Sequence, residues 1–179
     1  MKKTILLLML AVVINSCSVE VLVDGCTDIY AENFNPNADN DDGSCYYSCE
    51  DPYAINYNVS SNSYYCEYEA DVVFYEDVAA AVYFDNLGIN FLDVYVGNDY
   101  VGTLNATLGF TYTPNCYPID PDAVHFTLQW FDTQSSTFTW SVRDGSGQIH
   151  YNGTDIILAN NCLPMELTFK KIQKYKASK

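Results

Sequence analysis

Positive charge is scarce in this 179-residue sequence, in which eight Lys and Arg side chains stand against 23 Asp and Glu, for a net charge of −15. Most of the basic residues lie near the two ends of the chain, and only Arg143 lies between them. Nucleic-acid affinity comes largely from cations that neutralise phosphates, so this composition excludes a nucleic-acid partner. An acidic body favours solubility, cation binding or secretion instead.

Catalytic motifs are also lacking. The two histidines, His125 and His150, fall by strand alternation on the polar sides of their strands, which is typical of surface residues. The sequence contains no Gly-x-Ser-x-Gly elbow, no His-Glu-x-x-His pair and no glycine-rich phosphate loop. We therefore expect no catalytic residues and no enzyme activity. A glycan hydrolase is the less favoured alternative: carboxylates are plentiful, but so many acids make any pair uninformative, and a chain of this size rarely provides a deep cleft.

No apolar run is long enough to cross a bilayer, which needs about 20 residues. The run from Ile5 to Ile14 has ten residues and follows two lysines, as in a signal peptide. It continues as Asn15-Ser16-Cys17-Ser18, which resembles a bacterial lipobox and implies that Cys17 is lipidated and anchors the protein to a membrane. Ordinary signal-peptidase cleavage near the same place is the alternative.

Two cysteine-bounded segments, Cys26–Cys45 and Cys49–Cys66, are copies of each other. With Cys26 set on Cys49, the copies share an Asp, a Tyr, an Ala and two Asn, at Asp28/Asp51, Tyr30/Tyr53, Ala31/Ala54, Asn33/Asn56 and Asn35/Asn58. A two-residue deletion in the second copy then brings Cys45 onto Cys66. This register indicates a duplicated module. Each copy has few aliphatic residues, so each needs a covalent closure.

The cysteine count fits this interpretation. Seven cysteines are present, and assigning Cys17 to a lipid leaves six. The repeat boundaries favour disulfides Cys26–Cys45 and Cys49–Cys66, which leaves Cys116 to pair with Cys162. Zinc is the rival, but no Cys-x2-Cys pair occurs and both histidines lie far from the clustered cysteines.

The first copy resembles the Gly-Cys-Thr-Asp…Asp-Asp-Gly-Ser-Cys repeat of secreted, cell-surface proteins from certain Gram-negative bacteria. The matching residues are Gly25, Cys26, Thr27, Asp28, Ala31, Asn33, Phe34, Pro36, Ala38, Asp41, Asp42, Gly43, Ser44 and Cys45. The resemblance implies spacer modules between larger extracellular domains, without a catalytic role. By resemblance to lipoproteins, Ser18 after the lipidated cysteine implies sorting to the outer membrane, where surface exposure is a further expectation.

The chain after Asp71 alternates between apolar and polar residues, as half-buried antiparallel strands do. The clearest alternations run over 124–130, 137–143 and 165–170, and shorter strand-like runs are Val72–Glu76, Ala79–Phe84, Ile89–Val96 and Tyr100–Leu108. No stretch has a helical period with caps. We expect a mainly β protein, with small disulfide-stapled N-terminal modules followed by an antiparallel immunoglobulin-like β-sandwich. The expected parts are a signal peptide (1–17), a tether (18–24), two modules (25–69), the sandwich (71–170) and a solvated basic tail (171–179).

An acidic run in the first module is the candidate metal site. Asp39, Asp41 and Asp42 precede Gly43, and oxygen ligands around a glycine turn suit Ca2+. The second copy has Ser60-Ser61-Asn62-Ser63 at this place, so the module closes without the carboxylates. A solvated turn is therefore favoured over a calcium loop, and no other cofactor is expected.

Tyrosines are the candidate binding residues. A set in and beside the second module could form an aromatic surface for a sugar ring or a protein partner, namely Tyr46, Tyr47, Tyr64, Tyr65 and Tyr68. The alternative, slightly preferred, is that they pack on the disulfides and against the sandwich. The sequence thus predicts a non-catalytic envelope lipoprotein that is a structural or adhesive binding module, with a carbohydrate-binding module as the alternative.

Overall fold

The computed structural model describes residues 21–177, so Cys17 and the signal sequence lie outside the described residues. The described chain divides between Cys45 and Tyr46 into two compact units. The first unit contains the Cys26–Cys45 module. The second contains the Cys49–Cys66 module together with the sandwich. The second module is therefore one compact body with the sandwich, whereas the sequence grouped the two modules with each other.

The first unit has very little core. Two short strands, β1 (Asp24–Gly25) and β2 (Asn40–Asp41), pair in parallel, and Cys26 is bonded to Cys45. Within residues 21–45, the buried hydrophobic side chains are those of Cys26 and Ala31. Closing a loop of this size stabilises a fold by about 3 kcal/mol on the chain-entropy model, so the disulfide is the main constraint on this module.

The duplication is visible in the hydrogen bonds. In each copy the repeated Asp (Asp28, Asp51) accepts the backbone N–H two residues later through Oδ1, at 2.9 and 3.0 Å. The repeated Asn (Asn33, Asn56) donates through Nδ2 to the carbonyl of the residue before the closing cysteine, at 2.7 and 2.9 Å. The repeated residues thus supply side-chain hydrogen bonds that hold together a backbone with many turns and little sheet.

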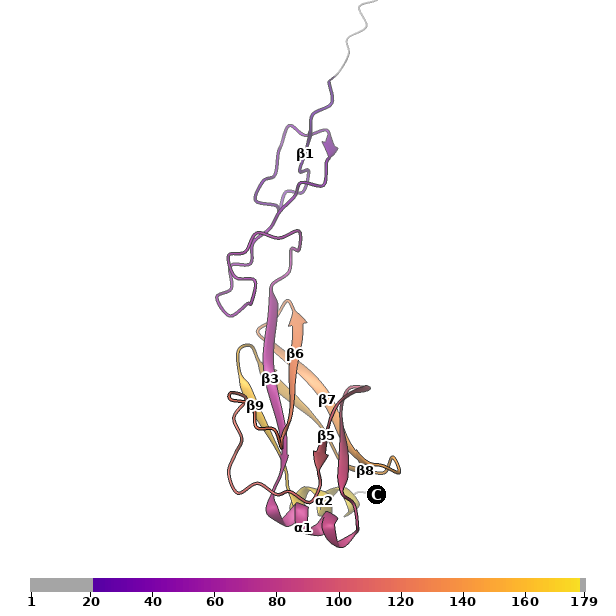
Figure 1. Ribbon diagram of the computed structural model, residues 1–179. Coiled ribbons are helices and arrows are strands. Elements are labelled where there is room, and N and C mark those ends of the chain that lie inside the picture. The colour runs from indigo at the N-terminus through magenta and orange to yellow at the C-terminus, as the bar shows by residue number, and fades with distance from the viewer. Residues whose placement is uncertain (1–20, 178–179) are drawn as a thin grey trace, which may run out of the picture. The chain divides into compact units, whose positions relative to one another are not determined.

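The sandwich consists of a three-stranded and a four-stranded sheet (Figure 1). The strand order is β6-β3-β9 in one sheet and β5-β4-β7-β8 in the other. The strands are β3 (Glu67–Glu76), β4 (Phe91–Val96), β5 (Asp99–Asn105), β6 (Val124–Phe131), β7 (Ser135–Asp144), β8 (Ile149–Leu158) and β9 (Cys162–Leu167). The mainly β fold with a two-sheet sandwich confirms the predicted class. One pairing departs from the antiparallel expectation, because β3 and β9 run parallel.

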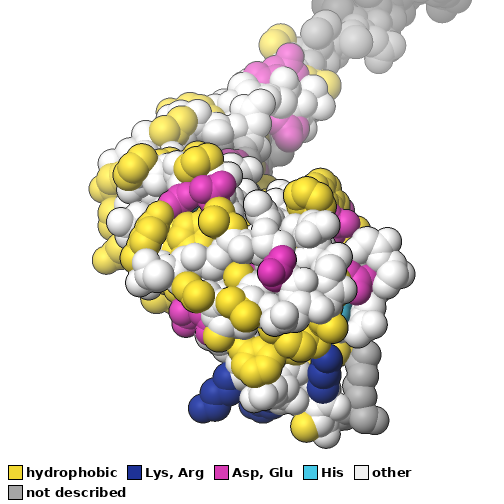
Figure 2. Space-filling model, turned by 60° about the horizontal axis from the view of Figure 1, so that its bottom comes forward, with side chains coloured by type: hydrophobic (Ala, Val, Ile, Leu, Met, Phe, Trp, Pro, Cys, Tyr) yellow, Lys and Arg dark blue, Asp and Glu magenta, His cyan; other side chains and the backbone are white. Residues whose placement is uncertain are grey.

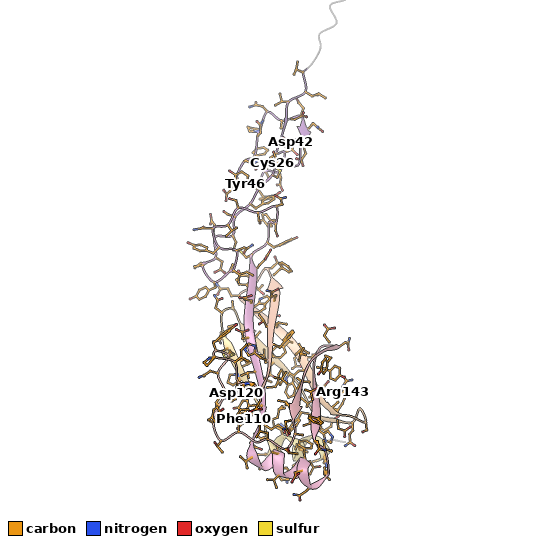
Figure 3. The ribbon with its side chains drawn as sticks, in the orientation of Figure 1. Cys26, Asp42, Tyr46, Phe110, Asp120 and Arg143 are labelled. Atoms are coloured by element: carbon orange, nitrogen blue, oxygen red, sulfur yellow. A yellow bond between two sulfur atoms is a disulfide. The ribbon has the colours of Figure 1, made fainter. Side chains whose placement is uncertain are left out.

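The core lies between the two sheets, where the apolar side of β3 faces β4, β7 and β8. Its largest members include Phe74, Leu92, Phe138, Trp140 and Tyr151. On the outer side of β3, the ring of Phe110 packs edge-on against Tyr75 at 5.8 Å. Figure 3 places Phe110 by the three-stranded sheet and Arg143 on the four-stranded sheet. The third predicted disulfide, Cys116–Cys162, ties the loop that carries Phe110 to the start of β9.

The segment predicted as a strand over Ala79–Phe84 is instead part of helix α1 (Val78–Asn86). The Oδ1 atom of Asp77 accepts the N–H of Ala80 at 2.7 Å, which is an N-cap. Three consecutive alanines favour a helix over a strand. The helix ends where Gly88 takes a left-handed conformation (φ 69°). The strand prediction was wrong because it relied on the strand-like residue pattern and overlooked the capping residue, Asp77.

The predicted basic tail is also wrong in form, because it belongs to a second helix, α2 (Phe169–Ala177). Ile172 is buried in the core and Phe169 packs against it, so the helix closes one end of the sandwich beside α1. All four lysines of the described chain lie on this helix, at 170, 171, 174 and 176, and each is exposed. Figure 2 shows Lys and Arg side chains gathered at this end of the sandwich.

Candidate binding surface

Of the five candidate tyrosines, Tyr46, Tyr64 and Tyr65 are exposed and Tyr47 is half-buried. Tyr64 and Tyr65 are 58% and 53% exposed, and Tyr46 is also exposed. The Tyr64 ring contacts Tyr47 edge-on at 5.6 Å and Tyr65 edge-on at 5.9 Å. Edge-to-face contacts of this kind orient neighbouring rings. We call Tyr46, Tyr47, Tyr64 and Tyr65 the tyrosine surface.

Tyr68 does not belong to this surface, which corrects the sequence-based grouping. It is only 2% exposed, because it is part of β3 and its ring stacks on Trp130 of β6 at 6.2 Å. Together with Cys49 and Ala54 it forms a small core against which Cys66, Trp130 and Ala159 pack. For Tyr68 the preferred alternative is thus confirmed: it joins the second disulfide to the sandwich.

Asp51 is the polar centre of the junction between the second module and the sandwich. Its Oδ2 atom accepts hydrogen bonds from the hydroxyl of Tyr68 at 2.7 Å and from Nε2 of Gln134 at 2.8 Å. A hydrogen bond from the Tyr53 backbone N–H, helped by those from Gln134 and Tyr68, lowers the pKa of Asp51. Burial and the nearby Asp51 charge raise the pKa of Tyr68 to about 12. The carboxylate therefore stays ionised and holds both partners.

The carboxylates of the acidic run in the first module accept hydrogen bonds from backbone N–H groups in turns. Asp39 accepts the N–H of Val23 at 3.1 Å, and Asp41 accepts that of Gly43 at 3.0 Å. Hydrogen bonds from Ser44 lower the pKa of Asp42. Residues 21–177 contain no group of three or more His, Cys, Asp or Glu arranged to hold a metal ion. The carboxylates thus act as hydrogen-bond acceptors that stabilise the turns of this module.

His150 is not a surface residue, contrary to the alternation argument. In β8 Tyr151 pairs with Val142, but Ile149 pairs with Arg143, so a bulge turns both His150 and Tyr151 inward. The His150 Nε2 atom lies 2.8 Å from Oδ2 of Asp144. Partial burial raises the pKa of Asp144, but hydrogen bonds from Ser146 and His150 outweigh it and leave the pKa well below its ordinary value.

His125 is half-buried on β6, where its ring lies 5.8 Å from that of Tyr117. Because β6 and β8 belong to different sheets, His125 and His150 do not lie on neighbouring strands. The ring contacts of both histidines, with Tyr117 for His125 and with Phe84 for His150, are those of packed side chains.

The pockets that open on the second unit include four lined by its described residues. Two border Trp140 and Gly153, and one of these reaches α2; a third lies in the loop around Asp120. The fourth, which we call the junction pocket, is lined by Tyr53, Gln134, Leu158, Ala159, Asn160 and Asn161. None of these four contains a histidine or more than one carboxylate.

The junction pocket was missed by sequence reasoning. Its lining comes from the second module, from the loop between β6 and β7, and from the end of β8 with the turn after it. The sequence signals were weak: Tyr53 is a repeated residue, and Asn160-Asn161 is a turn-like pair between two strands. Nothing local indicates that these segments meet.

Comparisons with known proteins give no relatives: no family model, no curated protein and no solved structure matches this chain. What the fold defines is the class, a mainly β protein with disulfide-stapled modules and a β-sandwich. Neither helix within residues 21–177 has the length and apolar character that crossing a membrane requires.

Proposed function

We propose that this chain is a non-catalytic lipoprotein of the bacterial cell envelope, anchored through Cys17 and acting as a binding or adhesion module at the outer membrane surface. The observation that carries the proposal is the composition of the first module. Its buried hydrophobic side chains within residues 21–45 are those of Cys26 and Ala31. A fold that depends so strongly on one disulfide needs an oxidising compartment, which supports a location outside the cytoplasm.

The N-terminal sequence supports the anchor. A ten-residue apolar run behind two lysines leads into Ile14-Asn15-Ser16-Cys17, the lipobox-like segment. A single lipid anchor needs no membrane-spanning helix. The partner on the membrane side is then the lipid bilayer, and the described units are displayed from it.

The tyrosine surface supports a binding role. Tyr64 and Tyr65 belong to a module that is closed by a disulfide, and each residue remains more than half exposed. Large exposed aromatic residues supply contact area at low entropy cost and are common in binding surfaces. A glycan or a protein is the partner, and a carbohydrate-binding module is the second candidate, favoured by these exposed rings.

The test is surface display together with lipid attachment in a Gram-negative host. The wild-type chain should incorporate labelled palmitate and be digested by protease added to intact cells. Cys17→Ser should lose the label, whereas the matched variant Ser18→Ala should keep it. A wild-type chain without label, or one fully protected from external protease, would contradict the anchored surface protein.

A further inference from the structure

The junction pocket has the size and lining of a ligand site. Its volume is about 410 Å³, within the range of about 300–1,000 Å³ that small-ligand sites span. We infer that the junction pocket binds a neutral saccharide unit of a glycan, an inference that rests on the proposed surface-binding function and names its ligand class and residues.

Side-chain amides supply the polar groups of the site. Gln134 and Asn160 each use one amide N–H within the protein: Nε2 of Gln134 donates to Asp51 at 2.8 Å, and Nδ2 of Asn160 donates to the Tyr53 carbonyl at 2.9 Å. A primary amide has two N–H donors and one carbonyl acceptor. Each residue therefore keeps one donor and its carbonyl oxygen for a ligand. Because sugar hydroxyls both donate and accept, they match such paired groups.

Asn161 adds a third amide, since its side chain makes no hydrogen bond among the described residues. Its neighbour Asn160 takes a left-handed conformation (φ 57°), which turns the chain sharply between β8 and β9. The backbone of this turn is fixed by two hydrogen bonds: Ala159 donates to the Gln134 carbonyl at 2.8 Å, and Asn160 donates to the Glu69 carbonyl at 2.8 Å. The amides are thus presented from a constrained backbone, which lowers the entropy cost of binding.

Apolar contact comes from Tyr53 and Leu158, each 54% exposed. A sugar ring has an apolar C–H face as well as its hydroxyls. An aromatic ring beside an aliphatic side chain can cover that face, while the amides bind the polar edge.

Charge selects a neutral ligand. The junction pocket has no Lys, Arg or His in its lining, and the ionised carboxylate of Asp51 lies directly behind Gln134. The whole chain carries a net charge of −15. An anionic sugar would meet no counter-charge here and would be repelled by the acidic body.

The test uses the full chain, produced with its disulfides formed, and follows the side-chain amide signals of Gln134, Asn160 and Asn161 by NMR. The probes are neutral oligosaccharides of glucose, mannose, galactose and xylose, with oligogalacturonate as the acidic counterpart. At least one neutral probe should shift these amide signals in a saturable manner, and oligogalacturonate should not.

Two variants separate the junction pocket from the tyrosine surface. Asn161→Ala and Tyr53→Ala should each weaken the neutral probe about tenfold, the equivalent of one lost hydrogen bond or ring contact. Neither substitution should unfold the junction, because the hydrogen bonds of Tyr53 are made by its backbone and the Asn161 side chain makes no hydrogen bond among the described residues. Tyr57→Ala is the matched control, since Tyr57 is exposed on the same module but outside the pocket.

The outcomes are distinguishable. If binding survives in Asn161→Ala and Tyr53→Ala but is lost in Tyr64→Ala/Tyr65→Ala, the pocket inference is overturned and the proposed function stands. If no neutral probe shifts the amide signals, the pocket inference is likewise overturned. The anchored surface role is then judged separately by palmitate labelling and protease accessibility.

Discussion

Glu76 places a carboxyl group in the core of the second unit. It lies on the core side of β3 with Val72 and Phe74, and it is only 1% exposed. Neither of its carboxyl oxygens has a hydrogen-bond partner among the described residues. Burial, helped by the neighbouring Asp77 charge, raises the pKa of Glu76 to about 9. The residue is therefore protonated in the folded protein at neutral pH.

This protonation links stability to pH. The ordinary pKa of the glutamate is 4.5. Between pH 4.5 and about 9, the folded state therefore holds a proton that the unfolded state has already released. The contribution of Glu76 to the free energy of unfolding is fully present below pH 4.5 and is lost as the pH rises toward 9. At pH 7 the loss amounts to about 3 kcal/mol, a large part of a domain's stability.

Glu76→Gln tests this reasoning because glutamine stays neutral at every pH. The assay is urea unfolding of the disulfide-intact protein at intervals from pH 5 to pH 9. The variant should match the wild type near pH 5 and exceed it by about 3 kcal/mol at pH 7, with a widening gap toward pH 9. Glu50→Gln, the same change at an exposed position, should show a flat difference. A constant difference between wild type and Glu76→Gln across this range would refute the raised pKa.

Three further outcomes follow from the structure. The double variant Cys26→Ala/Cys45→Ala should expose residues 21–45 to protease, because that module has little core. The double variant Cys49→Ala/Cys66→Ala should lower the free energy of unfolding by about 3 kcal/mol, but Tyr68 and Trp130 should still hold the second module in place. Equal protease sensitivity of the two modules would contradict this difference. Asp77→Ala should lower the free energy of unfolding by about 1 kcal/mol and Asp77→Ser by less, measured by urea titration, because Asp77 caps α1. Gly109→Ala should destabilise by about 2 kcal/mol, since a Cβ there would lie 2.4 Å from Cα of Val78; a melting temperature unchanged from wild type would contradict that close approach.

The features that the sequence predicted well are those set by local or covalent relations. The pairings of Cys26 with Cys45 and of Cys49 with Cys66 followed from the repeat boundaries, because partners 19 and 17 residues apart fall within one repeat unit. The sandwich strands followed from alternation, since a sheet with one buried face imposes a period of two.

The features that the sequence missed depend on contacts across the fold. Helix α2 is held in place by Ile172 and Phe169, which pack into the core of the sandwich. In the sequence alone these two residues stand among lysines, and such a stretch indicates a solvated tail. The bulge that buries His150 shifts the alternation of inward and outward side chains in β8 by one residue, and no pattern in the sequence predicts such a bulge. The parallel direction of β9 is set by the crossover from the other sheet.

The candidate sites differ in the same way. The exposure of Tyr64 and Tyr65 was foreseeable, because the second module is too small to bury every ring. The burial of Tyr68 required knowing that β3 begins at Glu67 and places its ring on Trp130. The junction pocket required three segments distant in sequence to meet.

The most direct test of the central claim is intact-mass and peptide-mass analysis of the mature protein under non-reducing conditions. The account predicts an acylated N-terminal Cys17 and three cystine-linked peptide pairs that join the cysteines found bonded in the structure, Cys26–Cys45, Cys49–Cys66 and Cys116–Cys162. Free thiols at Cys26, Cys45, Cys49 and Cys66, or a metal bound by them, would contradict both the envelope location and the covalent closure of the modules.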